Sequence, residues 1–431
     1  LLDEGFRVSG SDARESALTR HLESLGARVF YGQRPENILP GTDLAVYTAA
    51  IHPDNPEYAA AKAAGIPMLT RAELLGQIMK NYRLPIAVAG THGKTTTTSM
   101  ASEILLEARR DPTISVGGIL PSIGGNIRVG GSETFITEAC EYTNSFLSFF
   151  PKIGIILNMD ADHLDFFKDI QDIRRSFRKF AELIPADGTL IIDRDTPAWE
   201  TVAEGLPCRV ITYSLKEDAD YTAREIQFDQ EGHPSFTAFR GSESLGRFSL
   251  KIPGRHNVSN ALAAIALADL LGIKEDDVRR GFLRFHGADR RFQYKGTFQG
   301  VTVIDDYAHH PTEIRATLEA AQNYPHKALW CVFQPHTYTR TKALFSQFAQ
   351  ALSLADHVVL ADIYAARETD TLGISSEALA AAVSDLGTDS VYLPSFEAIE
   401  EFLKKNCSPG DLLITMGAGD VVNIGEKLIQ A

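Results

Sequence analysis

The chain has 431 residues, and at roughly 150 residues per domain this length suggests about three domains. Its 42 Lys and Arg residues against 56 Asp and Glu residues give a formal net charge of −14, which argues against a general binder of nucleic acid or anionic membranes. The composition is 44% hydrophobic, with four widely spaced cysteines and no apolar run of transmembrane length. We therefore expect a reduced, cytoplasmic protein without membrane insertion.

Strands and helices alternate along most of the sequence, which predicts an α/β fold with mainly parallel sheets. In the first region, residues 1–4 are expected to end a helix, with Gly5 as its C-cap and a strand at residues 6–9. This order is typical of the second half of a βαβ unit, so we expect its first strand and glycine turn upstream of Leu1. Further strands are expected at residues 28–31, 44–47 and 68–69, and helices at residues 57–64 and 72–81.

The second region opens at residue 84 with a predicted strand, a glycine-containing turn and a helix. Its strands are expected at residues 85–89, 134–137, 152–157 and 189–192, its helices at residues 94–108 and 257–271, and antiparallel hairpins within residues 208–252. In the third region, helices alternate with strands expected at residues 301–304, 328–333, 357–360, 390–393 and 412–415. The pattern therefore repeats the α/β alternation in each region.

Residues 87–98, AVAGTHGKTTTT, are the sharpest local motif of the chain. A buried strand enters a turn with two glycines and a helix leaves it, so that backbone N–H groups and Lys94 can hold a polyphosphate. Thr95 can offer its hydroxyl to Mg²⁺. Val88 stands where a full Walker A motif has its first glycine, and an ordinary βα turn with capping threonines is the alternative interpretation.

Acidic residues and a histidine follow the next two predicted strands. Glu138 ends the first of these strands and Glu141 comes three residues later, where a metal ligand beside a phosphate loop would be needed. Asp160, Asp162 and His163 follow the second strand and could hold a second cation or a phosphate. A solvated loop acid and a surface or capping histidine are the alternative readings.

Two paired motifs come later in the chain. Asn257 and Asn260 are neighbours on one face of a helix, where two amides can read a base edge or simply cap the helix. Arg290 and Arg291 sit at the junction of the second and third regions, and this pair is either a solvated linker or a phosphate clamp on a hinge.

In the third region, three polar loops follow predicted strands: residues 305–313 (DDYAHHPTE), 334–341 (QPHTYTRT) and 417–420 (GAGD). Loops at the carboxyl ends of parallel strands meet at one edge of an open α/β sheet, which is the expected place for a ligand. Arg340 has a guanidinium fork suited to a carboxylate or phosphoryl group, and a neutral His336 could accept a proton near pH 7.

Taken together and in order, these motifs resemble the Mur ligases, the ATP-dependent amide-forming enzymes of peptidoglycan precursor synthesis. The resemblance runs over nearly the whole chain, through the segments GTHGKTTT, EACEYTNSFL, DADH, GRHNVSNA, DDYAHHPTE, FQPHTYTRT and GAGD. Two departures are visible: Cys140 and Thr143 replace the more usual carboxylates of the second segment, and Thr337 stands where many relatives carry Arg.

The resemblance implies an α/β fold of three domains: a UDP-binding Rossmann-like domain at residues 1–83, a P-loop ATPase domain at residues 84–292 and a Rossmann-like domain for the amino acid at residues 293–431. The third-region motifs are most similar to the members that join L-alanine to UDP-N-acetylmuramate. The expected cofactors are ATP and Mg²⁺, the expected partners are these two small-molecule substrates and no nucleic acid, and the expected state is a monomer or homodimer.

The family's site residues can be carried over position by position. The resemblance implies catalytic roles for Lys94, His163, His336 and Arg340. It implies ATP contacts for Gly90, Thr91, His92, Gly93, Lys94, Thr95, Thr96, His256, Asn257, Asn260 and Arg291. It implies metal ligands at Thr95, Glu138 and His163. It implies substrate contacts for Ser9, Asp12, Gly125, Asn126 and His309.

Two alternatives stay open from the sequence. One is a sister ligase that adds a preformed peptide to UDP-N-acetylmuramate in cell-wall recycling, which would share the loops and differ in the acceptor pocket. The other is a nucleotide-binding regulator with a degenerate site. Intact Gly93, Lys94, Glu138 and His163 argue against degeneracy.

Overall fold

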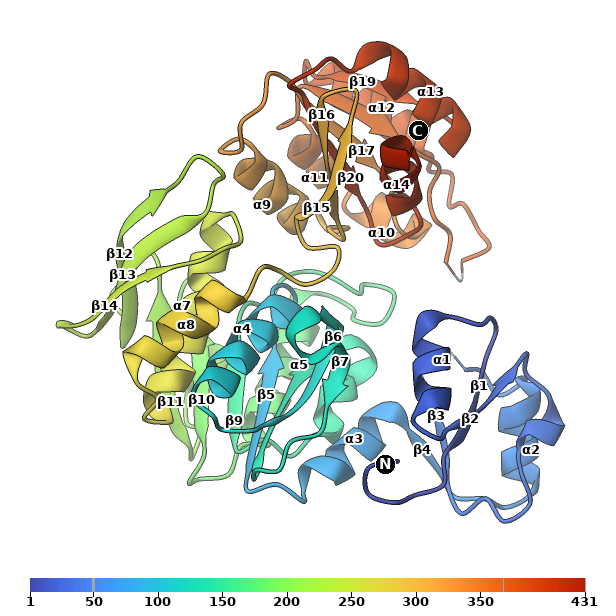
Figure 1. Cartoon of the computed structure of the whole chain (residues 1–431), viewed down its shortest axis with the longest axis vertical. Coiled ribbons are helices and arrows are strands. Elements are labelled where there is room, and N and C mark those ends of the chain that lie inside the picture. Colours follow the sequence, from blue (N-terminus) through green and yellow to red (C-terminus); the bar gives the residue numbers. More distant parts are fainter. Residues whose placement is uncertain (49–50, 367, 431) are drawn as a thin grey trace.

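The computed structural model describes residues 1–48, 51–366 and 368–430, which form three lobes in chain order (Figure 1). The first lobe contains two short parallel strand pairs, β1 with β2 and β3 with β4. Its elements are β1 (Ser9–Asp12), α1 (Ala17–Ser24), β2 (Arg28–Tyr31), η1 (Pro35–Asn37), β3 (Ala45–Tyr47), α2 (Pro56–Ala63), β4 (Met68–Thr70) and α3 (Arg71–Met79).

The start of the chain confirms one prediction and corrects another. Gly5 has a φ of +84°, its N–H donates to the Leu2 carbonyl at 2.9 Å, and the Phe6 N–H donates to the Leu1 carbonyl at 3.1 Å. These two bonds are the pattern that closes a helix C-terminus on a glycine. The strand expected at residues 6–9 is wrong by three residues: Phe6 is exposed, and pairing with β2 begins only at Ser9.

The middle lobe is built on a ten-stranded sheet with the order β14-β13-β12-β11-β10-β9-β5-β8-β6-β7. Its strands are β5 (Leu84–Ala89), β6 (Thr113–Leu120), β7 (Gly125–Arg128), β8 (Thr134–Ala139), β9 (Ile153–Ile156), β10 (Thr189–Asp193), β11 (Arg209–Ser214), β12 (Tyr221–Phe228), β13 (Pro234–Arg240) and β14 (Glu243–Ser249). Its helices are α4 (Lys94–Glu107), η2 (Pro121–Ile123), η3 (Tyr142–Ser148), α5 (Ile170–Glu182), α6 (Glu200–Ala203), α7 (Arg255–Leu270) and α8 (Glu275–Arg284).

Two details of this sheet differ from the sequence prediction. The hairpins expected within residues 208–252 are only partly correct, because β11 lies parallel to β10 and to β12, and antiparallel pairing starts with β12–β13–β14. A crossover through α6 brings the chain back to the same end of the sheet, which makes β11 parallel. β8 continues one residue beyond Glu138, which was expected to end the strand, since the ladder with β5 reaches the pair Ala89–Ala139.

Both faces of this sheet are covered by helices, and the alternation along β5 shows why. Ile86 and Val88 point into one buried cluster with α4, α7 and α8, whereas Ala87 and Ala89 point into a second buried cluster with α5. Successive side chains of a strand face opposite sides, so a central strand of such a sheet is apolar throughout. The turn after β5 is therefore anchored by a fully buried strand.

The third lobe has a six-stranded sheet with the order β15-β16-β20-β17-β18-β19. Its strands are β15 (Gln293–Phe298), β16 (Val301–Asp306), β17 (Leu329–Phe333), β18 (His357–Leu360), β19 (Asp389–Tyr392) and β20 (Leu412–Met416). Its helices are α9 (Pro311–Ala321), α10 (Tyr338–Ala343), α11 (Phe345–Leu352), α12 (Ser376–Asp385), α13 (Phe396–Asn406) and α14 (Val422–Gln430). The last strand, β20, lies between β16 and β17, so the three polar loops that follow these strands emerge side by side.

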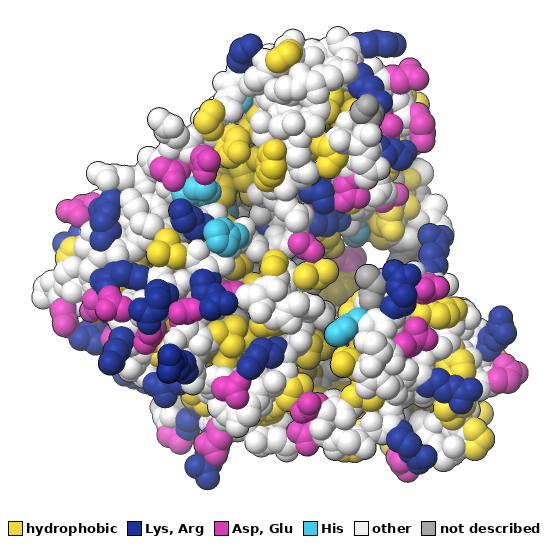
Figure 2. All heavy atoms as spheres, viewed as in Figure 1, with side chains coloured by type: hydrophobic (Ala, Val, Ile, Leu, Met, Phe, Trp, Pro, Cys, Tyr) yellow, Lys and Arg dark blue, Asp and Glu magenta, His cyan; other side chains and the backbone are white. Residues whose placement is uncertain are grey.

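The surface has no strongly single-signed face in the view of Figure 2, where Lys and Arg side chains are interspersed with Asp and Glu. The same view shows a hollow where the three lobes meet. Over the part of the chain that the structure describes, no helix is both long and apolar enough to cross a bilayer.

Candidate functional site

The glycine turn after β5 has the geometry of a phosphate loop. Gly90 and Gly93 have φ values of +142° and +83°, which disfavour other residues, and α4 begins directly at Lys94. A Cβ atom on Gly93 would lie 2.6 Å from Oδ1 of Asn260. The turn is thus closed against α7, and a larger residue at either glycine would push the loop out of place.

Lys94 lies inside this loop with a buried carboxylate. Its Nζ donates to the carbonyls of Gly90 at 2.6 Å and Thr91 at 3.1 Å and to Oε2 of Glu141 at 2.9 Å. Burial opposes the charge of Lys94, but the Glu141 carboxylate outweighs it and raises the pKa of Lys94 above its ordinary value. The lysine therefore stays protonated, as a residue that binds phosphate must.

Glu141 keeps one oxygen free for another positive group. It is only 2% exposed, and its Oε1 has no hydrogen-bond partner among the described residues. Nε2 of His163 lies 3.9 Å from that oxygen, and the His163 ring stacks on Tyr142 with the ring centres 4.4 Å apart. A buried carboxylate oxygen without a partner, beside an imidazole, is a fitting place for a cation.

Thr95 and Glu138 form a second oxygen-rich corner of the loop. The Thr95 hydroxyl donates to Oε2 of Glu138 at 3.1 Å, and the Gly117 N–H donates to the other carboxylate oxygen. A Cβ atom on Gly117 would lie 2.8 Å from Oε2 of Glu138. A side chain at position 117 would therefore collide with the carboxylate, and glycine leaves room for it. Hydroxyl and carboxylate oxygens are the ligands that Mg²⁺ prefers, and the residues fit that ion.

The loop after β9, in the middle lobe, contacts the third lobe. Asp162 is 6% exposed, and its Oδ1 accepts from Nε of Arg340 at 3.0 Å and from the His163 N–H at 2.7 Å. Burial alone would raise the pKa of Asp162, but the Arg340 guanidinium and His163 hold it well below its usual range. Asp162 is therefore a carboxylate at neutral pH and pairs with a cation from the other lobe.

Three predicted residues of the third lobe come together beside this pair. Nη1 of Arg340 lies 3.2 Å from Nδ1 of His336, and the rings of His336 and His309 have their centres 6.0 Å apart. Burial and, for His336, the nearby Arg340 lower the pKa of each histidine to about 4. Both imidazoles are consequently neutral at physiological pH. They differ in the partner of Nδ1, which is an arginine N–H for His336 and the Tyr307 carbonyl for His309.

A cavity of about 350 Å³ lies between these loops. Its lining comes from both lobes: Tyr142, Ala161, Asp162, His163, Leu164, Asp165, His336, Thr337, Thr339, Arg340, Ala343, Leu344, Ala366 and Glu368. The cavity combines a guanidinium, imidazoles and carboxylates with apolar walls, which is the usual composition of a small-molecule site.

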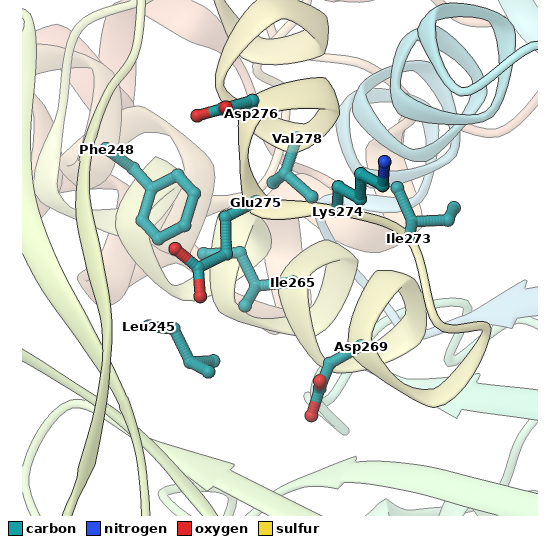
Figure 3. A pocket seen from close by; sticks show the side chains of 9 residues that line it. All are labelled: Leu245, Phe248, Ile265, Asp269, Ile273, Lys274, Glu275, Asp276 and Val278. Carbon is teal, nitrogen blue, oxygen red and sulfur yellow. The ribbon is translucent and has the colours of Figure 1, made fainter.

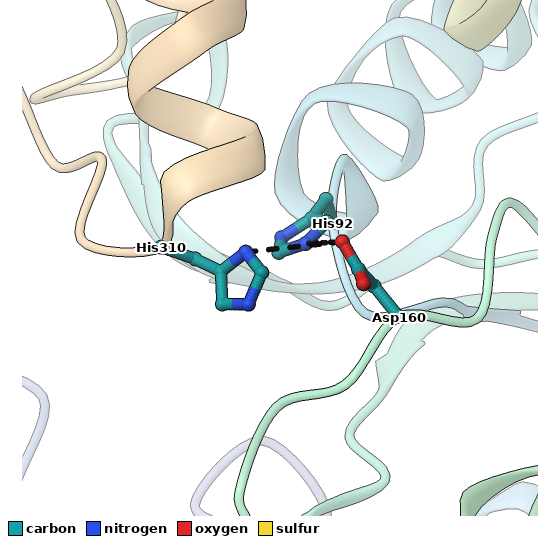
Figure 4. A group of neighbouring side chains, drawn as sticks. All are labelled: His92, Asp160 and His310. Carbon is teal, nitrogen blue, oxygen red and sulfur yellow. Dashed lines mark hydrogen bonds and ion pairs between the residues drawn. The ribbon is translucent and has the colours of Figure 1, made fainter. Parts of the chain in front are cut away.

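The phosphate loop also touches the third lobe through His92. Nε2 of His92 lies 3.4 Å from Oδ2 of Asp160 (Figure 4). Nδ1 of His92 lies 3.2 Å from Oε1 of Glu313 at the start of α9. Burial would lower the pKa of His92, but the hydrogen bonds to these two carboxylates raise it to about 9. Nδ1 of His310 approaches the same Asp160 oxygen to 3.8 Å.

The amides of α7 lie beside the loop and do not cap their helix. The helix begins at Arg255 with Gly254 as its N-cap, so capping by Asn257 or Asn260 is ruled out. Nδ2 of Asn257 donates to the Pro253 carbonyl at 2.7 Å, and Nδ2 of Asn260 donates to Oδ1 of Asn257 at 3.1 Å. Both amides are buried, while the neighbouring His256 is exposed.

The two arginines at the junction of the lobes have different partners. Arg290 bonds to Oδ2 of Asp305 at 2.8 Å and to the carbonyls of Gly417 and Gly419, which fastens the junction to the third sheet. Arg291 lies 5.3 Å above the Tyr307 ring and 3.9 Å from Glu313. Arg290 is thus a structural anchor, and Arg291 faces the loops of the site.

Some predicted residues lie outside this cluster. Ser9 and Asp12 are exposed on β1 of the first lobe, and Gly125 and Asn126 begin the edge strand β7 of the middle sheet. Thr96 is half-buried in the first turn of α4. These positions are compatible with contacts to a large substrate that spans the lobes, and they make no closed site by themselves.

Three residues that the fold makes central are absent from the site residues that the resemblance implied. Glu141 pairs with Lys94, Asp162 pairs with Arg340, and Glu313 contacts His92 and lies 3.4 Å from His309. Each stood in a motif that was noticed as a block. The signal that singles them out is spatial contact with a lysine, arginine or histidine, but the partners Lys94, Arg340 and His92 are distant in sequence.

A second cavity, of about 380 Å³, opens at the other end of α7 (Figure 3). It is lined by Leu245, Phe248, Ile265, Asp269, Ile273, Lys274, Glu275, Asp276 and Val278. Its acids already have partners, since Asp269 pairs with Arg240 and Glu275 with Arg279. His163, His336 and Arg340, three of the residues predicted to be catalytic, line the cavity between the middle and third lobes instead.

Comparison with known families agrees with the three lobes. Residues 1–83 match the model described as "Mur ligase family, catalytic domain". Residues 88–268 match "Mur ligase middle domain", and residues 290–419 match "Mur ligase, glutamate ligase domain". The predicted α/β fold with a three-domain architecture of this kind is confirmed.

Individual proteins are similar over the full chain. A UDP-N-acetylmuramate–L-alanine ligase of Agathobacter rectalis is 62% identical, covering 100% of this chain and 94% of the relative, and one of Lachnospira eligens is 59% identical with the same coverage. The crystal structure of a UDP-N-acetylmuramate-alanine ligase from Thermotoga maritima superposes with a TM-score of 0.83 at 28% identity, covering 99% of this chain and 94% of that one. A murein peptide ligase from Psychrobacter arcticus gives a TM-score of 0.72 at 25% identity, covering 100% and 94%.

Proposed function

The chain belongs to the Mur ligase family, and from this premise we propose that it is an ATP-dependent ligase joining L-alanine to the carboxylate of UDP-N-acetylmuramate. The observation that carries the proposal is that the loop after β9 touches both sides: the Asp160 N–H donates to the Thr91 hydroxyl of the phosphate loop at 2.9 Å, and Asp162 accepts from Arg340 at the cavity of the third lobe. Full-length identity of 62% to a relative named for this activity supports the substrates.

We propose the following division of labour among the lobes. Residues 1–83 bind the UDP-sugar, residues 84–292 bind ATP, and residues 293–431 bind the amino acid. Each of the three sets of sheets lies within one of these ranges, which supports the boundaries. Since ATP and a UDP-sugar are both cytoplasmic metabolites, we propose that the reaction takes place in the cytoplasm.

The reaction begins with transfer of the ATP γ-phosphoryl group to the muramoyl carboxylate, which gives an acyl phosphate and ADP. In our proposal Lys94 contacts the β- and γ-phosphates, the backbone of residues 90–96 surrounds them, and His256, Asn257 and Asn260 contact the rest of the nucleotide. One Mg²⁺ held by Thr95 and Glu138 and a second held by His163 would neutralise charge that develops on the phosphoryl oxygens. Arg291 approaches the phosphates from the junction.

The amino group of L-alanine then attacks the acyl phosphate, and the tetrahedral intermediate collapses to the amide and phosphate. We assign Arg340 to the alanine carboxylate or the developing oxyanion, since its Nη1 lies next to His336 at the cavity. Closure of the third lobe excludes water, which would otherwise hydrolyse the acyl phosphate.

The hydrogen bonds separate the roles of the two histidines. Nδ1 of His336 accepts from Arg340, so its proton sits on Nε2 and His336 serves as a donor rather than the proton acceptor that the sequence suggested. Nδ1 of His309 donates to the Tyr307 carbonyl at 3.0 Å, which leaves the Nε2 lone pair free. We therefore assign acceptance of the amine proton to His309.

The substrate-binding assignments complete the proposal. Gly125 and Asn126 contact the muramoyl sugar, and Ser9 and Asp12 contact the uridine. A cavity wall that fits a methyl side chain separates alanine from glycine by only about 1–3 kcal/mol, so slow use of glycine is expected.

The decisive experiment measures ADP release and amide formation with UDP-N-acetylmuramate, ATP, Mg²⁺ and a panel of acceptors. L-Alanine should be preferred over bulkier amino acids and over a preformed tripeptide. Preference for the tripeptide would assign the chain to cell-wall recycling instead. Nucleotide binding without turnover for any acceptor would leave only the regulatory alternative.

A further inference from the structure

We propose that His92, Asp160 and His310 form a binding site for a divalent transition-metal ion such as Zn²⁺, bridging the middle and third lobes. One donor atom from each residue lies within 4.8 Å of the other two (Figure 4). This set is separate from Thr95, Glu138 and His163, the Mg²⁺ ligands proposed above, and it does not depend on the proposed reaction.

The separations of the donor atoms suit a small cation. Nε2 of His92 and Nδ1 of His310 lie 3.4 Å and 3.8 Å from the same oxygen of Asp160. Ligand atoms on tetrahedral zinc, with bonds of about 2.0–2.1 Å, lie roughly 3.4 Å apart. A shift of the His310 ring on the order of an ångström would therefore bring the three atoms, now within 4.8 Å of one another, to bonding geometry.

Each ligand is held by a second partner that orients it. The other nitrogen of His92 lies 3.2 Å from Glu313, and Nε2 of His310 lies 3.2 Å from the Ala161 carbonyl. The other carboxylate oxygen of Asp160, Oδ1, accepts from the Ala161 N–H at 2.8 Å. Carboxylate or carbonyl partners behind ligating histidines are the usual second layer of a metal site, because they set the tautomer and raise basicity.

The ligand chemistry selects the kind of metal. Two imidazoles and one carboxylate favour zinc and similar first-row ions over Mg²⁺, whose ligands are mainly oxygens. His310 is 3% exposed, which keeps water from competing for it. Thr312 bonds to the same atoms: its N–H donates to Nδ1 of His310 at 3.3 Å and its hydroxyl donates to Asp160, and a cation would replace these bonds.

The position of the site gives it a consequence for motion. His92 belongs to the phosphate loop and Asp160 to the loop after β9, while His310 is the N-cap of α9 in the third lobe. A metal bound to all three would hold the third lobe against the phosphate loop. Zinc should therefore stabilise the closed arrangement of the two lobes.

The test is calorimetric titration of the whole chain with Zn²⁺ in excess Mg²⁺ and without nucleotide, supported by the visible spectrum of bound Co²⁺. We expect one ion per chain and a radius of gyration from small-angle scattering that falls on binding. His310→Asn, which retains a good capping residue, and Asp160→Asn should each weaken binding at least tenfold and abolish the scattering change. His233→Asn, which removes a surface histidine paired with Asp229, should leave both unchanged.

The outcomes separate a metal site from a plain ion pair. No zinc binding by the wild type would mean that His92 simply holds a proton between Asp160 and Glu313. Equal binding by the wild type and both variants would place the zinc elsewhere, and either result overturns the proposal. If His310→Asn does not fold, Asp160→Asn alone decides between these results.

Discussion

Arg340 of α10 donates from Nε to Oδ1 of Asp162 at 3.0 Å, although the two residues are 178 positions apart in the chain. The side chains are 11% and 7% exposed, so the pair is largely removed from water. It is one of the contacts between the third lobe and the loop after β9, which lies next to the phosphate loop. The pair therefore joins the loop that bears His163 to the proposed acceptor site of the third lobe.

Replacing Arg340 tests this connection. Arg340→Ala should lower kcat/KM for L-alanine by ~30- to 1,000-fold, on the order of 2–4 kcal/mol, because the pair and the substrate contact are both lost. Arg340→Lys should lose less, since the charge remains without the planar fork. Steady-state kinetics with varied L-alanine measure both, and Arg279→Lys is the matched control, since Arg279 lies on α8 and pairs there with Glu275 and Asp276. Wild-type kinetics in both Arg340 variants would contradict the placement.

Lys94→Ala should leave the protein folded and reduce ligation by ~30- to 1,000-fold, because a charge inside the phosphate loop is lost from the transition state. Folding is checked by circular dichroism and turnover by ADP release. Lys152→Ala, which removes a lysine paired with Asp187 at the surface, should be close to wild type. Near-normal turnover of Lys94→Ala would exclude the phosphate-loop assignment.

Glu138→Gln and His163→Ala should each raise the Mg²⁺ concentration needed for half-maximal turnover, because each removes a proposed ligand. The measurement is the initial rate at constant ATP with varied Mg²⁺. Glu133→Gln is the control, since Glu133 directly precedes the same strand and pairs with Arg83 on the surface. Identical Mg²⁺ curves for wild type and both site variants would mean that the metal ligands lie elsewhere.

Asp193, at the end of β10, should make the stability of the protein depend on pH. Burial and the neighbouring Asp195 raise the pKa of Asp193 to about 7, although the Asp195 N–H and the Ser259 hydroxyl, 3.2 Å away, favour the charged form. The unfolded chain loses this proton near pH 4 and the folded chain near pH 7, so the free energy of unfolding falls as pH rises between these values.

Asp193→Asn removes that titration. The variant should therefore gain stability relative to wild type at pH 8, by at most roughly 4 kcal/mol at about 1.4 kcal/mol per pKa unit, and show no gain below about pH 4. Urea unfolding at both pH values measures the difference. Asp187→Asn provides a contrast: the salt bridge to Lys152 lowers the pKa of Asp187, so the effect of removing it has the opposite sign. A pH-independent difference for Asp193→Asn would refute the argument.

The sequence by itself determined the α/β class, most strand positions and the phosphate loop. These features are local: the run from β5 through Gly90 and Gly93 to Lys94 is contiguous, and a buried strand, two glycines and a helix start can be read within a dozen residues. The order of motifs along the chain also indicated the family. Strand ends shifted by one to three residues, as at Ser9 and Glu138, because pairing across the sheet decides where a strand stops.

Only the tertiary structure decided which loops face one another. Glu141 became the partner of Lys94, Asp162 that of Arg340, and His92 reached Glu313. These pairs depend on β5 lying between β8 and β9 and on β20 lying between β16 and β17. Strand order is set by how whole layers pack against their helices, and a local pattern of residues does not contain that information. A motif can therefore indicate its chemistry while its spatial neighbours stay unpredicted.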